Sequence, residues 1–207
     1  MNPLDPRLLA LSLVCLPMWA GEAKSLFDGR TLRGWEGDPK VWSVEDGAIT
    51  AGRLDLNFPR NEFLATTRGY TNFILRLRFK IEGTEGFVNS GVQIRSERVP
   101  NHHEMVGYQA DIGEGWYGAL YDESRRNTIL AKPDPEVVKK AVKPGQWNHY
   151  EIRADGNRVT LKINDIQTVD YTEKDPKIVS NGKLAVQIHG AGKTRVQFKD
   201  ISIEELP

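Results

Sequence analysis

The stretch that decides the fold is Phe73–Ile81, which reads FILRLRFKI. Its apolar side chains alternate with Arg76, Arg78 and Lys80, and a period of two residues is typical of a β-strand with one face in a core and the other in solvent. Shorter alternating runs recur about every 8 to 15 residues on both sides of this stretch, between clusters of glycine, asparagine, aspartate and proline. The pattern predicts an all-β sandwich or barrel.

Two further parts of the sequence support this fold class. Tyr150–Ala154 and Val159–Ile163 alternate in the same way, and the residues that join them, Asp155-Gly156-Asn157, tolerate the positive φ of a hairpin turn. Near the end of the chain, Val196–Ile203 predicts a final strand with a bulge near Lys199-Asp200.

The domain organisation is expected to be simple. At most one short helix is predicted, near residues 135–142 (PEVVKKAV), and no repeat or linker divides residues 24–207, which we expect to form one domain. The 28 basic residues balance the 28 acidic residues. A neutral chain has no field that would draw it to a phosphate backbone, so nucleic acid is not expected as a partner.

The N-terminal segment differs in kind from the rest. Arg7 precedes the charge-free run Leu8–Ala20, and small residues follow at Gly21 and Ala23. The run is too short to span a bilayer, and this order is typical of a secretory signal peptide over residues 1–23. We therefore expect export to the periplasm or the extracellular space, with no integral membrane segment in the mature chain. An uncleaved N-terminal anchor is the alternative.

Four predicted strands carry large polar side chains opposite their apolar residues. These strands are 89–95, 108–112, 119–121 and 184–189, and their polar residues are Asn89, Gln93, Arg95, Gln109, Asp111, Tyr121, Gln187 and His189. If the strands are neighbours in a curved sheet, the concave face gathers amides, a cation, a carboxylate, an imidazole and an aromatic ring, and this mixture suits a sugar. Solvated strand faces are the alternative, although such faces favour threonine, lysine and glutamate.

A second polar cluster lies in the loop 98–104, RVPNHHE. His102, His103 and Glu104 are expected to contact a substrate or to remain solvated. Two adjacent histidines in an extended segment point to opposite sides, so we do not expect them to bind one metal ion. Cys15 is the single cysteine and lies in the predicted leader, which excludes thiolate metal sites from the mature domain. No metal or other cofactor is expected.

The segment Gln109–Glu114, QADIGE, has nearly the spacing of the acidic strand motif in laminarinase-like retaining glycosidases. In that motif the first residue is a glutamate nucleophile and the last is a glutamate acid. An amide cannot form a glycosyl ester, so Gln109 excludes the covalent step. The chain therefore either only binds sugar or uses chemistry that needs no such nucleophile.

Several motifs together carry a resemblance to a known family. They are LFDGRTL at 26–32 with Gly34-Trp35, WSVEDGAI at 42–49, NSGV at 89–92, GALY at 118–121, GQWN at 145–148, VQIH at 186–189 and FKDI at 198–201. With them the chain resembles the 3-keto-disaccharide hydrolase domain family. The resemblance implies a concanavalin-like jelly-roll sandwich of two antiparallel sheets, frequent export and activity on glucosides oxidised at C3. The family commonly carries Glu-x-Gln where this chain has Gln109-x-Asp111, so the acid stands two residues further along the same face.

The resemblance also implies a reaction without a covalent ester. A C3 carbonyl acidifies the proton on C2, so a base can remove that proton, the C1 substituent leaves and water adds to the enone. His189 is the expected acid or base, Arg95 the cation for the enolate oxygen, and Asp111 or Tyr121 the group for the remaining proton transfer. A 3-keto-glucoside is the expected partner, and its expected binding residues are Asn89, Gln93, Gln109, Gln187, His102, His103 and Glu104. The alternatives are a non-catalytic, lectin-like carbohydrate-binding domain on the same fold and an ordinary glycosidase.

Overall fold

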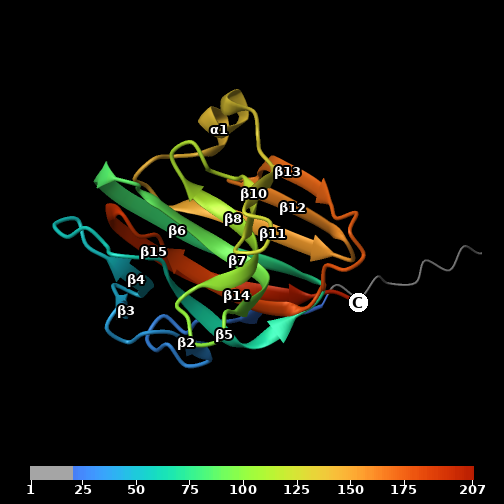
Figure 1. Ribbon diagram of the computed structural model, residues 1–207, viewed down its shortest axis with the longest axis horizontal. Coiled ribbons are helices and arrows are strands. Elements are labelled where there is room, and N and C mark those ends of the chain that lie inside the picture. The colour runs from blue at the N-terminus through green and yellow to red at the C-terminus, as the bar shows by residue number, and fades with distance from the viewer. Residues whose placement is uncertain (1–20) are drawn as a thin grey trace, which may run out of the picture.

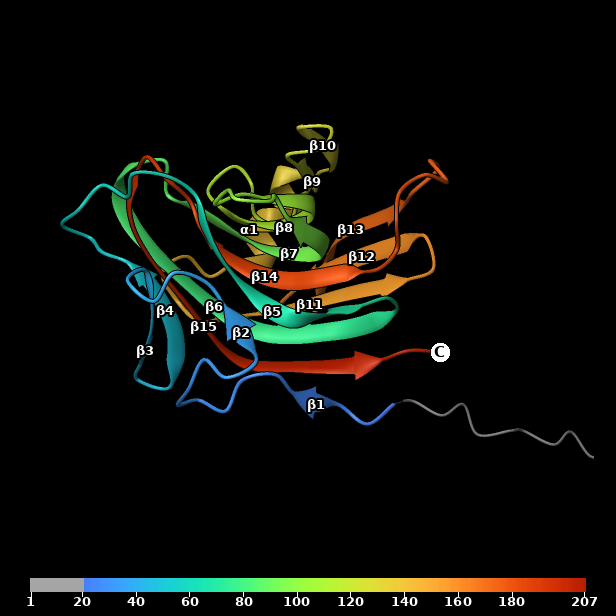
Figure 2. The same ribbon diagram turned by 60° about the horizontal axis from the view of Figure 1, so that its bottom comes forward.

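The computed structural model describes residues 21–207, which form two curved antiparallel sheets packed face to face (Figures 1 and 2). The first sheet has the strand order β13-β12-β11-β6-β15-β4-β3, with β1 paired to β15. Its strands are β1 (Lys24–Ser25), β3 (Trp42–Glu45), β4 (Ala48–Gly52), β6 (Phe73–Gly86), β11 (Asn148–Asp155), β12 (Arg158–Ile163), β13 (Ile166–Thr172) and β15 (Gly192–Glu205).

The second sheet has the order β10-β9-β8-β7-β14-β5-β2. Its strands are β2 (Trp35–Glu36), β5 (Glu62–Tyr70), β7 (Asn89–Arg98), β8 (Met105–Gly113), β9 (Leu120–Glu123), β10 (Thr128–Ala131) and β14 (Gly182–Ile188). The predicted all-β sandwich of two antiparallel sheets is confirmed.

The alternation in Phe73–Ile81 places a row of its side chains in the core between the sheets. Phe79 from β6 and Phe198 from β15 are fully buried there, and the second sheet contributes Ile94 and Ile112 from the facing side. Complete burial of one such side chain stabilises the fold by about 1.5–3 kcal/mol relative to exposure. The same core contains the apolar side of the predicted hairpin, in which Ile152 of β11 lies opposite Leu161 of β12.

Strand order shows how distant parts of the chain meet. The late strand β14 lies between β7 and β5, and β15 lies between β6 and β4. The predicted bulge in the final strand is confirmed, because the register between β15 and β6 shifts between Lys199 and Ser202, and Asp200 has a φ of 52°.

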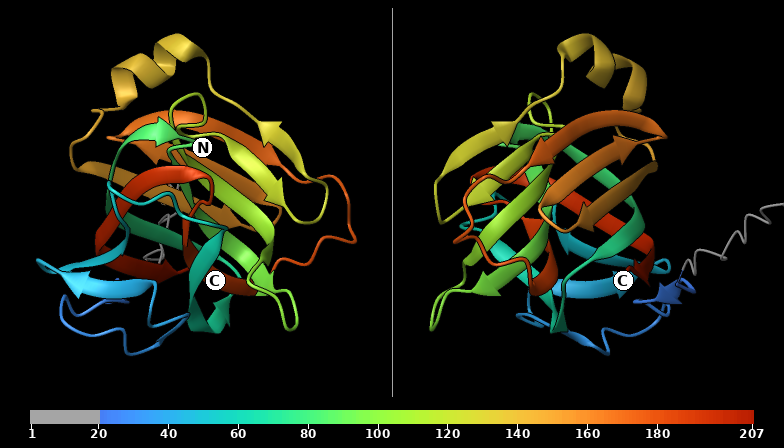
Figure 3. Two further views of the ribbon diagram at one scale, coloured as in Figure 1. Left: turned by 60° about the vertical axis from the view of Figure 1, so that its left-hand side comes forward. Right: turned by 90° about the vertical axis from the view of Figure 1, so that its right-hand side faces the viewer.

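The helix α1 (Pro135–Ala141) lies at one end of the sandwich (Figure 3). It begins where the Asp134 side chain accepts a hydrogen bond of 2.8 Å from the Glu136 amide, with Pro135 in the first turn. Lys139 and Lys140 in the last turn complement the negative end of the helix dipole. The predicted short helix near 135–142 is confirmed.

Most of the predicted signal peptide, residues 1–20, lies outside the described residues, and the first strand begins at Lys24. Among residues 21–207, no helix is long and apolar enough to cross a membrane.

Candidate functional site

The second sheet carries a row of hydrogen-bonded polar side chains on the face turned away from the core. Ser96 Oγ donates to Gln93 Oε1 at 2.6 Å, and Gln93 Nε2 donates to Gln109 Oε1 at 2.9 Å. Gln109 Nε2 in turn donates to Asp111 Oδ1 at 2.9 Å. We call these four residues the polar row. Because each amide both accepts and donates, the polar row fixes the orientation of the Asp111 carboxyl group.

The polar row is buried, so it does not form the solvated strand face that was the alternative interpretation. Gln93 is 0% exposed and Asp111 is 2% exposed. Met105, at the start of β8, joins Phe63, Ala65 and Ala185 in a small apolar cluster separate from the main core. This cluster covers part of the face and removes the polar row from solvent.

Gly91 makes room for the polar row. It lies opposite Asp111 in the pairing of β7 with β8. A Cβ atom at Gly91 would lie 2.5 Å from Cγ of Gln109, so the Gln109 side chain crosses the strand directly over this glycine. The glycine in the NSGV motif is therefore required for Gln109 to reach Asp111.

Two buried side chains beside the polar row have polar atoms without a hydrogen-bond partner among residues 21–207. They are Asp111, through Oδ2, and Gln187, through both atoms of its amide. Burial raises the pKa of Asp111 well above its ordinary value, and the charge of Glu123 adds to this effect, while the Gln109 hydrogen bond and Lys132 oppose it. A buried polar group without a hydrogen-bond partner lowers the stability of the fold by about 1–3 kcal/mol. Such groups are typical of a site that receives a ligand.

Contacts connect six residues from distant parts of the chain into an aromatic half and a polar half that meet at His189, and we call them the site ring: Asn61, Phe87, Glu104, Trp116, Tyr121 and His189. Its aromatic half is continuous. The Phe87 ring packs edge to face on the His189 ring, with ring centres 4.6 Å apart, and on the Trp116 ring at 6.1 Å. Trp116 packs in the same way on Tyr121 at 6.0 Å.

The polar half of the site ring runs back from His189 to Glu104. The Gly190 amide donates to Asn61 Oδ1 at 3.0 Å, and Asn61 Nδ2 donates to Glu104 Oε1 at 3.2 Å. His189 Nδ1 lies 2.7 Å from the Gly190 carbonyl oxygen. Since a carbonyl oxygen only accepts, Nδ1 carries the proton and Nε2 of the neutral ring has a free lone pair.

Asn89, Gln187 and His189 lie beside one another where β7 and β14 pair. The His189 amide donates to the Asn89 carbonyl at 3.3 Å, and Ser90 Oγ donates to the Gln187 carbonyl at 2.6 Å. His189 follows directly on the last residue of β14 and is half-buried. The structure thus brings together most of the predicted polar set: Asn89, Gln93, Gln109, Asp111, Tyr121, Gln187 and His189.

Glu123 belongs to this site but is absent from the predicted set. Burial and the charge of Glu104 raise its pKa from 4.5 to about 7. Burial raises the pKa of Tyr121 as well, and the charges of Glu123 and Asp111 add to that shift. The sequence contains the signal: Leu120 is buried, so alternation from Tyr121 places Glu123 on the same face.

Arg95 lies away from the site, which corrects its predicted place on the shared strand face. The register of β7 with β8 shifts between Ile94 and Glu97, and Arg95 adopts a φ of 48°. This bulge redirects the side chain, so Nε donates to the Thr71 carbonyl at 2.9 Å and Nη1 to the Gly156 carbonyl at 2.7 Å. Because Gly156 is in the turn between β11 and β12, Arg95 connects the two sheets at their far edge.

His102 and His103 lie in the turn at the tip of the β7–β8 hairpin. Their rings stack with centres 4.2 Å apart. The expectation that they point to opposite sides is therefore wrong, because this segment is a turn and not an extended strand. Glu104 Oε1 lies 3.6 Å from His103 Nδ1, which connects the turn to the site ring.

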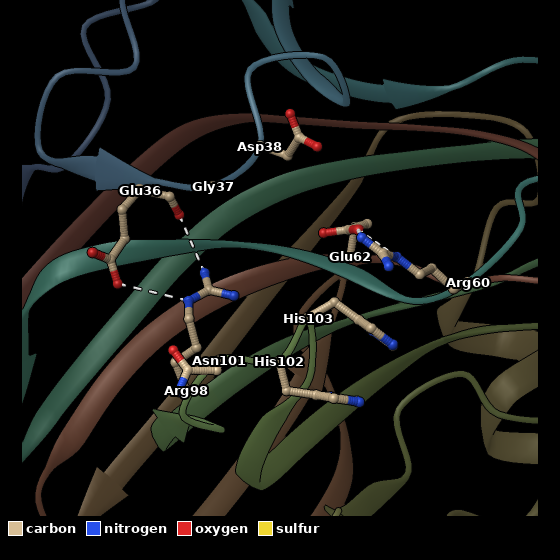
Figure 4. A pocket seen from close by; sticks show the side chains of 9 residues that line it. All are labelled: Glu36, Gly37, Asp38, Arg60, Glu62, Arg98, Asn101, His102 and His103. Atoms are coloured by element: carbon tan, nitrogen blue, oxygen red, sulfur yellow. Dashed lines mark hydrogen bonds and ion pairs between the residues drawn. The ribbon is translucent and has the colours of Figure 1, made fainter.

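A cavity of 720 Å³ opens beside this turn (Figure 4). Figure 4 shows His102 and His103 on one side of it, facing Arg60 and Glu62. Arg60 pairs with Glu62 at 2.7 Å, and Arg98 pairs with Glu36 at 3.8 Å, so opposite charges in its wall neutralise each other. This cavity is polar and lies directly next to the site ring.

Within residues 21–207, no three histidine, cysteine, aspartate or glutamate side chains come together as metal ligands would.

Solved structures share the fold of this β-sandwich. A putative glycosyl hydrolase from Parabacteroides distasonis matches with a TM-score of 0.69 and 22% identity, over 90% of this chain and 94% of that chain. The carbohydrate-binding module CBM66 from Bacillus subtilis matches with a TM-score of 0.64 and 14% identity, over 83% and 96%. At these identities the similarity establishes the fold alone.

The chain belongs to the family described as the 3-keto-alpha-glucoside-1,2-lyase-like domain, whose family model matches residues 22–204. This confirms the resemblance found in the sequence. A 3-keto-disaccharide hydrolase from Bacteroides thetaiotaomicron is 25% identical over 175 residues, which cover 75% of this chain and 60% of that protein. The chain thus spans about 60% of the length of this curated relative.

Proposed function

We propose that this domain cleaves glycosides that are already oxidised at C3, by proton removal at C2, elimination at C1 and addition of water. Family membership and the name of the curated relative support a reaction on a 3-keto sugar. The observation that carries the proposal is the pair of buried, unpartnered groups of Asp111 and Gln187 inside the site ring. They offer a proton-transfer group and a hydrogen-bond donor where neither is used by the fold.

His189 is the proposed base for the proton on C2. Its Nδ1 proton is held by the Gly190 carbonyl, so Nε2 presents the lone pair. When the C2–H bond breaks, its electron pair forms the C2–C3 double bond and the C3 oxygen becomes an enolate. The Gln187 amide, which has a free donor, is proposed to stabilise that oxygen in place of Arg95.

Asp111 is the proposed acid for the leaving group. In the elimination the enolate re-forms the C3 carbonyl, the C1–O bond breaks and a C1–C2 double bond forms. The departing oxygen takes the proton of Asp111, because burial raises the pKa of that carboxyl group and favours its protonated form. Water then adds its oxygen to C1 and a proton to C2, and Glu123, with a pKa of about 7, is the proposed base for that step.

The side chains near the site also support a sugar as the substrate. Trp116 and Phe87 form an aromatic wall on which the C–H face of a sugar ring can stack, while the unpartnered amide of Gln187 can hydrogen-bond to a sugar oxygen. The reaction needs no covalent glycosyl ester, which accords with an amide at position 109.

The test is incubation of the purified protein with a 3-keto-glucoside and, separately, with its unoxidised parent, with release of the aglycone as the measurement. We expect release from the keto sugar alone. His189→Ala should lower kcat/KM by roughly 10² to 10⁴ without a change in Tm, because loss of a general base costs about that factor. His149→Ala is the matched control, since His149 is a half-buried histidine on the other sheet. Full turnover by His189→Ala would remove His189 from the mechanism.

A non-catalytic carbohydrate-binding domain is the second candidate function. The observation that favours it is the aromatic wall of Phe87 and Trp116 on a fold shared with a carbohydrate-binding module. Calorimetric binding of the keto-glucoside with no release of aglycone over many hours would establish this second function and overturn the first. Either function would act on sugars outside the cytoplasm, since export through a cleaved leader is part of the proposal.

A further inference from the structure

A groove lies beside α1, where β6 of the first sheet faces the segment between β8 and β9, and it is separate from the site ring. It has a volume of 1070 Å³, and sites that bury small ligands typically span about 300–1,000 Å³. Its lining is mainly apolar, with Ile81, Val88, Tyr117, Pro133, Val138 and Val142 among the residues. Such a large apolar groove is more than the scattered exposed side chains of an ordinary surface.

The groove and the site ring share a wall. Val88 and Tyr117 line the groove, and the residues immediately before them, Phe87 and Trp116, belong to the aromatic half of the site ring. Lys132 also lines the groove, and its Nζ lies 6.0 Å from the Trp116 ring centre. Lys132 therefore stands between the groove and the aromatic half of the site ring.

The charges at the groove do not favour an ionic ligand. The groove is lined by three acidic residues and two basic residues, so neither sign of charge dominates: Glu82, Glu114, Glu136, Lys132 and Lys139. Convergent amides of the kind found in the polar row are missing from the residues that line it. A neutral apolar group therefore fits this groove better than a second sugar, whose hydroxyl groups would lose hydrogen bonds to water.

We propose that the groove binds the aglycone of the substrate and that this aglycone is an uncharged apolar ring. The inference rests on the proposed function, because it assigns the part of a keto-glycoside that leaves C1. The sugar lies within the site ring, the scissile bond lies near Asp111, and the departing group extends past Trp116 into the groove.

The experiment compares cyclohexyl and methyl 3-keto-glucosides of the same anomeric configuration, whose leaving alcohols have similar basicity. For the wild type, we expect a KM at least tenfold lower for the cyclohexyl compound. Val138→Asp should remove that advantage, whereas Val137→Asp should retain it. Val137→Asp is the matched control: Val137 is a neighbouring half-buried valine of α1 that does not line the groove.

A second measurement separates failure of the inference from failure of the proposed function. Calorimetry with the unoxidised cyclohexyl glucoside should give a Kd about tenfold weaker for Val138→Asp than for Val137→Asp, whether or not the protein is an enzyme. If both keto-glucosides are cleaved with equal KM and Val138→Asp changes neither, the groove is not the aglycone site. If neither is cleaved but the calorimetric difference holds, the proposed reaction fails and the apolar binding site stands.

Discussion

The order of the amide and the acid along β8 decides the chemistry of the polar row: the amide is at position 109 and the acid is at position 111. Gln109 accepts from Gln93 and donates to Asp111, and only an amide can do both without a change of charge. With the amide at 109 and the acid at 111, the carboxyl group stands at the end of the row with one free oxygen. The family's more common order, Glu-x-Gln, would place the acid in the middle.

Gln109→Glu tests this arrangement. A glutamate at 109 would place a second carboxyl group within hydrogen-bond distance of Asp111, and two buried carboxylates cannot both ionise there. We expect the free energy of unfolding to fall by about 1–3 kcal/mol and keto-glucoside turnover to fall sharply, with no hydrolysis of laminarin. Chemical denaturation and product assays measure both effects. Gln167→Glu, the same change at an exposed amide, should leave both unchanged; vigorous laminarin cleavage by the Gln109 variant would contradict the assignment.

Glu123→Gln tests the electrostatics of the site through pH. The folded pKa of Glu123 is raised from 4.5 to about 7, so the folded state binds its proton more tightly than the unfolded state. Its contribution to stability is therefore fully present below about pH 4.5 and is lost as pH rises to about 7. We expect the difference in Tm, variant minus wild type, to increase across this pH window. Above about pH 7 this difference should stay constant.

The acidic groups that face Glu123 are Glu104, Asp111 and Asp122. Glu97→Gln, at an exposed carboxyl group of the same sheet, provides the baseline for thermal melts over the pH series. A constant difference in Tm between the Glu123 variant and the wild type from pH 4 to 8 would show that Glu123 does not titrate in this window.

At the scale of single elements, alternation predicts the strands well and fails where a strand bulges. The Phe73–Ile81 pattern places β6 and its buried face correctly, since its pairing follows a period of two. The pattern of 89–95 places Gln93 correctly but not Arg95, because the register shift after Ile94 depends on how β8 pairs with β7. A single sequence does not contain that cross-strand information.

Alternation in the sequence does not predict the burial of the polar row either. Alternation separates the two faces of a sheet, and it places Gln109 and Asp111 opposite the core. It does not indicate that Met105 packs on Phe63, which lies more than forty positions earlier in the chain. The covered face, and with it the raised pKa of Asp111, follows from tertiary packing.

A network of charges joins the β9–β10 turn to the segment after β13. Arg126 pairs with the fully buried Asp122 and, at 2.7 Å, with Glu173. Tyr108 Oη and Tyr171 Oη donate to the same Glu173 carboxylate at 2.6 and 3.1 Å. Although burial raises the pKa of Glu173, the hydrogen bonds from Arg126 and Tyr108 outweigh it and hold the pKa well below its ordinary range.

Glu173→Gln should weaken this connection between the sheets. The amide keeps the shape of the side chain but removes the charge that Arg126 faces, so we expect the free energy of unfolding to fall by about 1–3 kcal/mol at neutral pH. Since the folded pKa of Glu173 is lowered, its contribution is present above the unfolded value of 4.5 and is lost as pH falls below it. The loss in urea melts should therefore shrink in acid. An equal loss at pH 3 and pH 7 would rule out a charge effect.

At the scale of the whole molecule, strand order builds the site from segments that are far apart in sequence. His189 follows β14, which lies between β7 and β5, and this insertion brings the imidazole beside Asn89. The sequence predicts which residues face away from the core, while the neighbours of each strand follow only from the topology. The site ring emerges for the same reason, since contacts of Asn61 with Glu104 join distant loops.

The fold also bears on where the mature chain begins. We predict that residues 1 to about 23 are removed on export, which intact-mass analysis of protein from the periplasm or medium would detect. The structure gives this a second test. Lys24 pairs with Ile203 at the edge of β15, so cleavage before Lys24 leaves this strand pairing complete. Intact Met1 on exported protein would contradict the prediction.

Two recombinant chains compare the ends directly. One that starts at Lys24 should have the Tm of the full chain. One that starts after Phe27 loses a buried aromatic ring, the 2.8 Å bond from the Leu26 amide to the Ile201 carbonyl and the 2.8 Å bond from Trp35 Nε1 to the Leu26 carbonyl. Those losses sum to about 2.5–6 kcal/mol, because the ring contributes about 1.5–3 kcal/mol and each of the two hydrogen bonds about 0.5–1.5 kcal/mol. If the chain that starts at Lys24 melts several degrees below the full chain, residues before Lys24 contribute to the fold, and the domain boundary predicted at 24 must move towards the N-terminus.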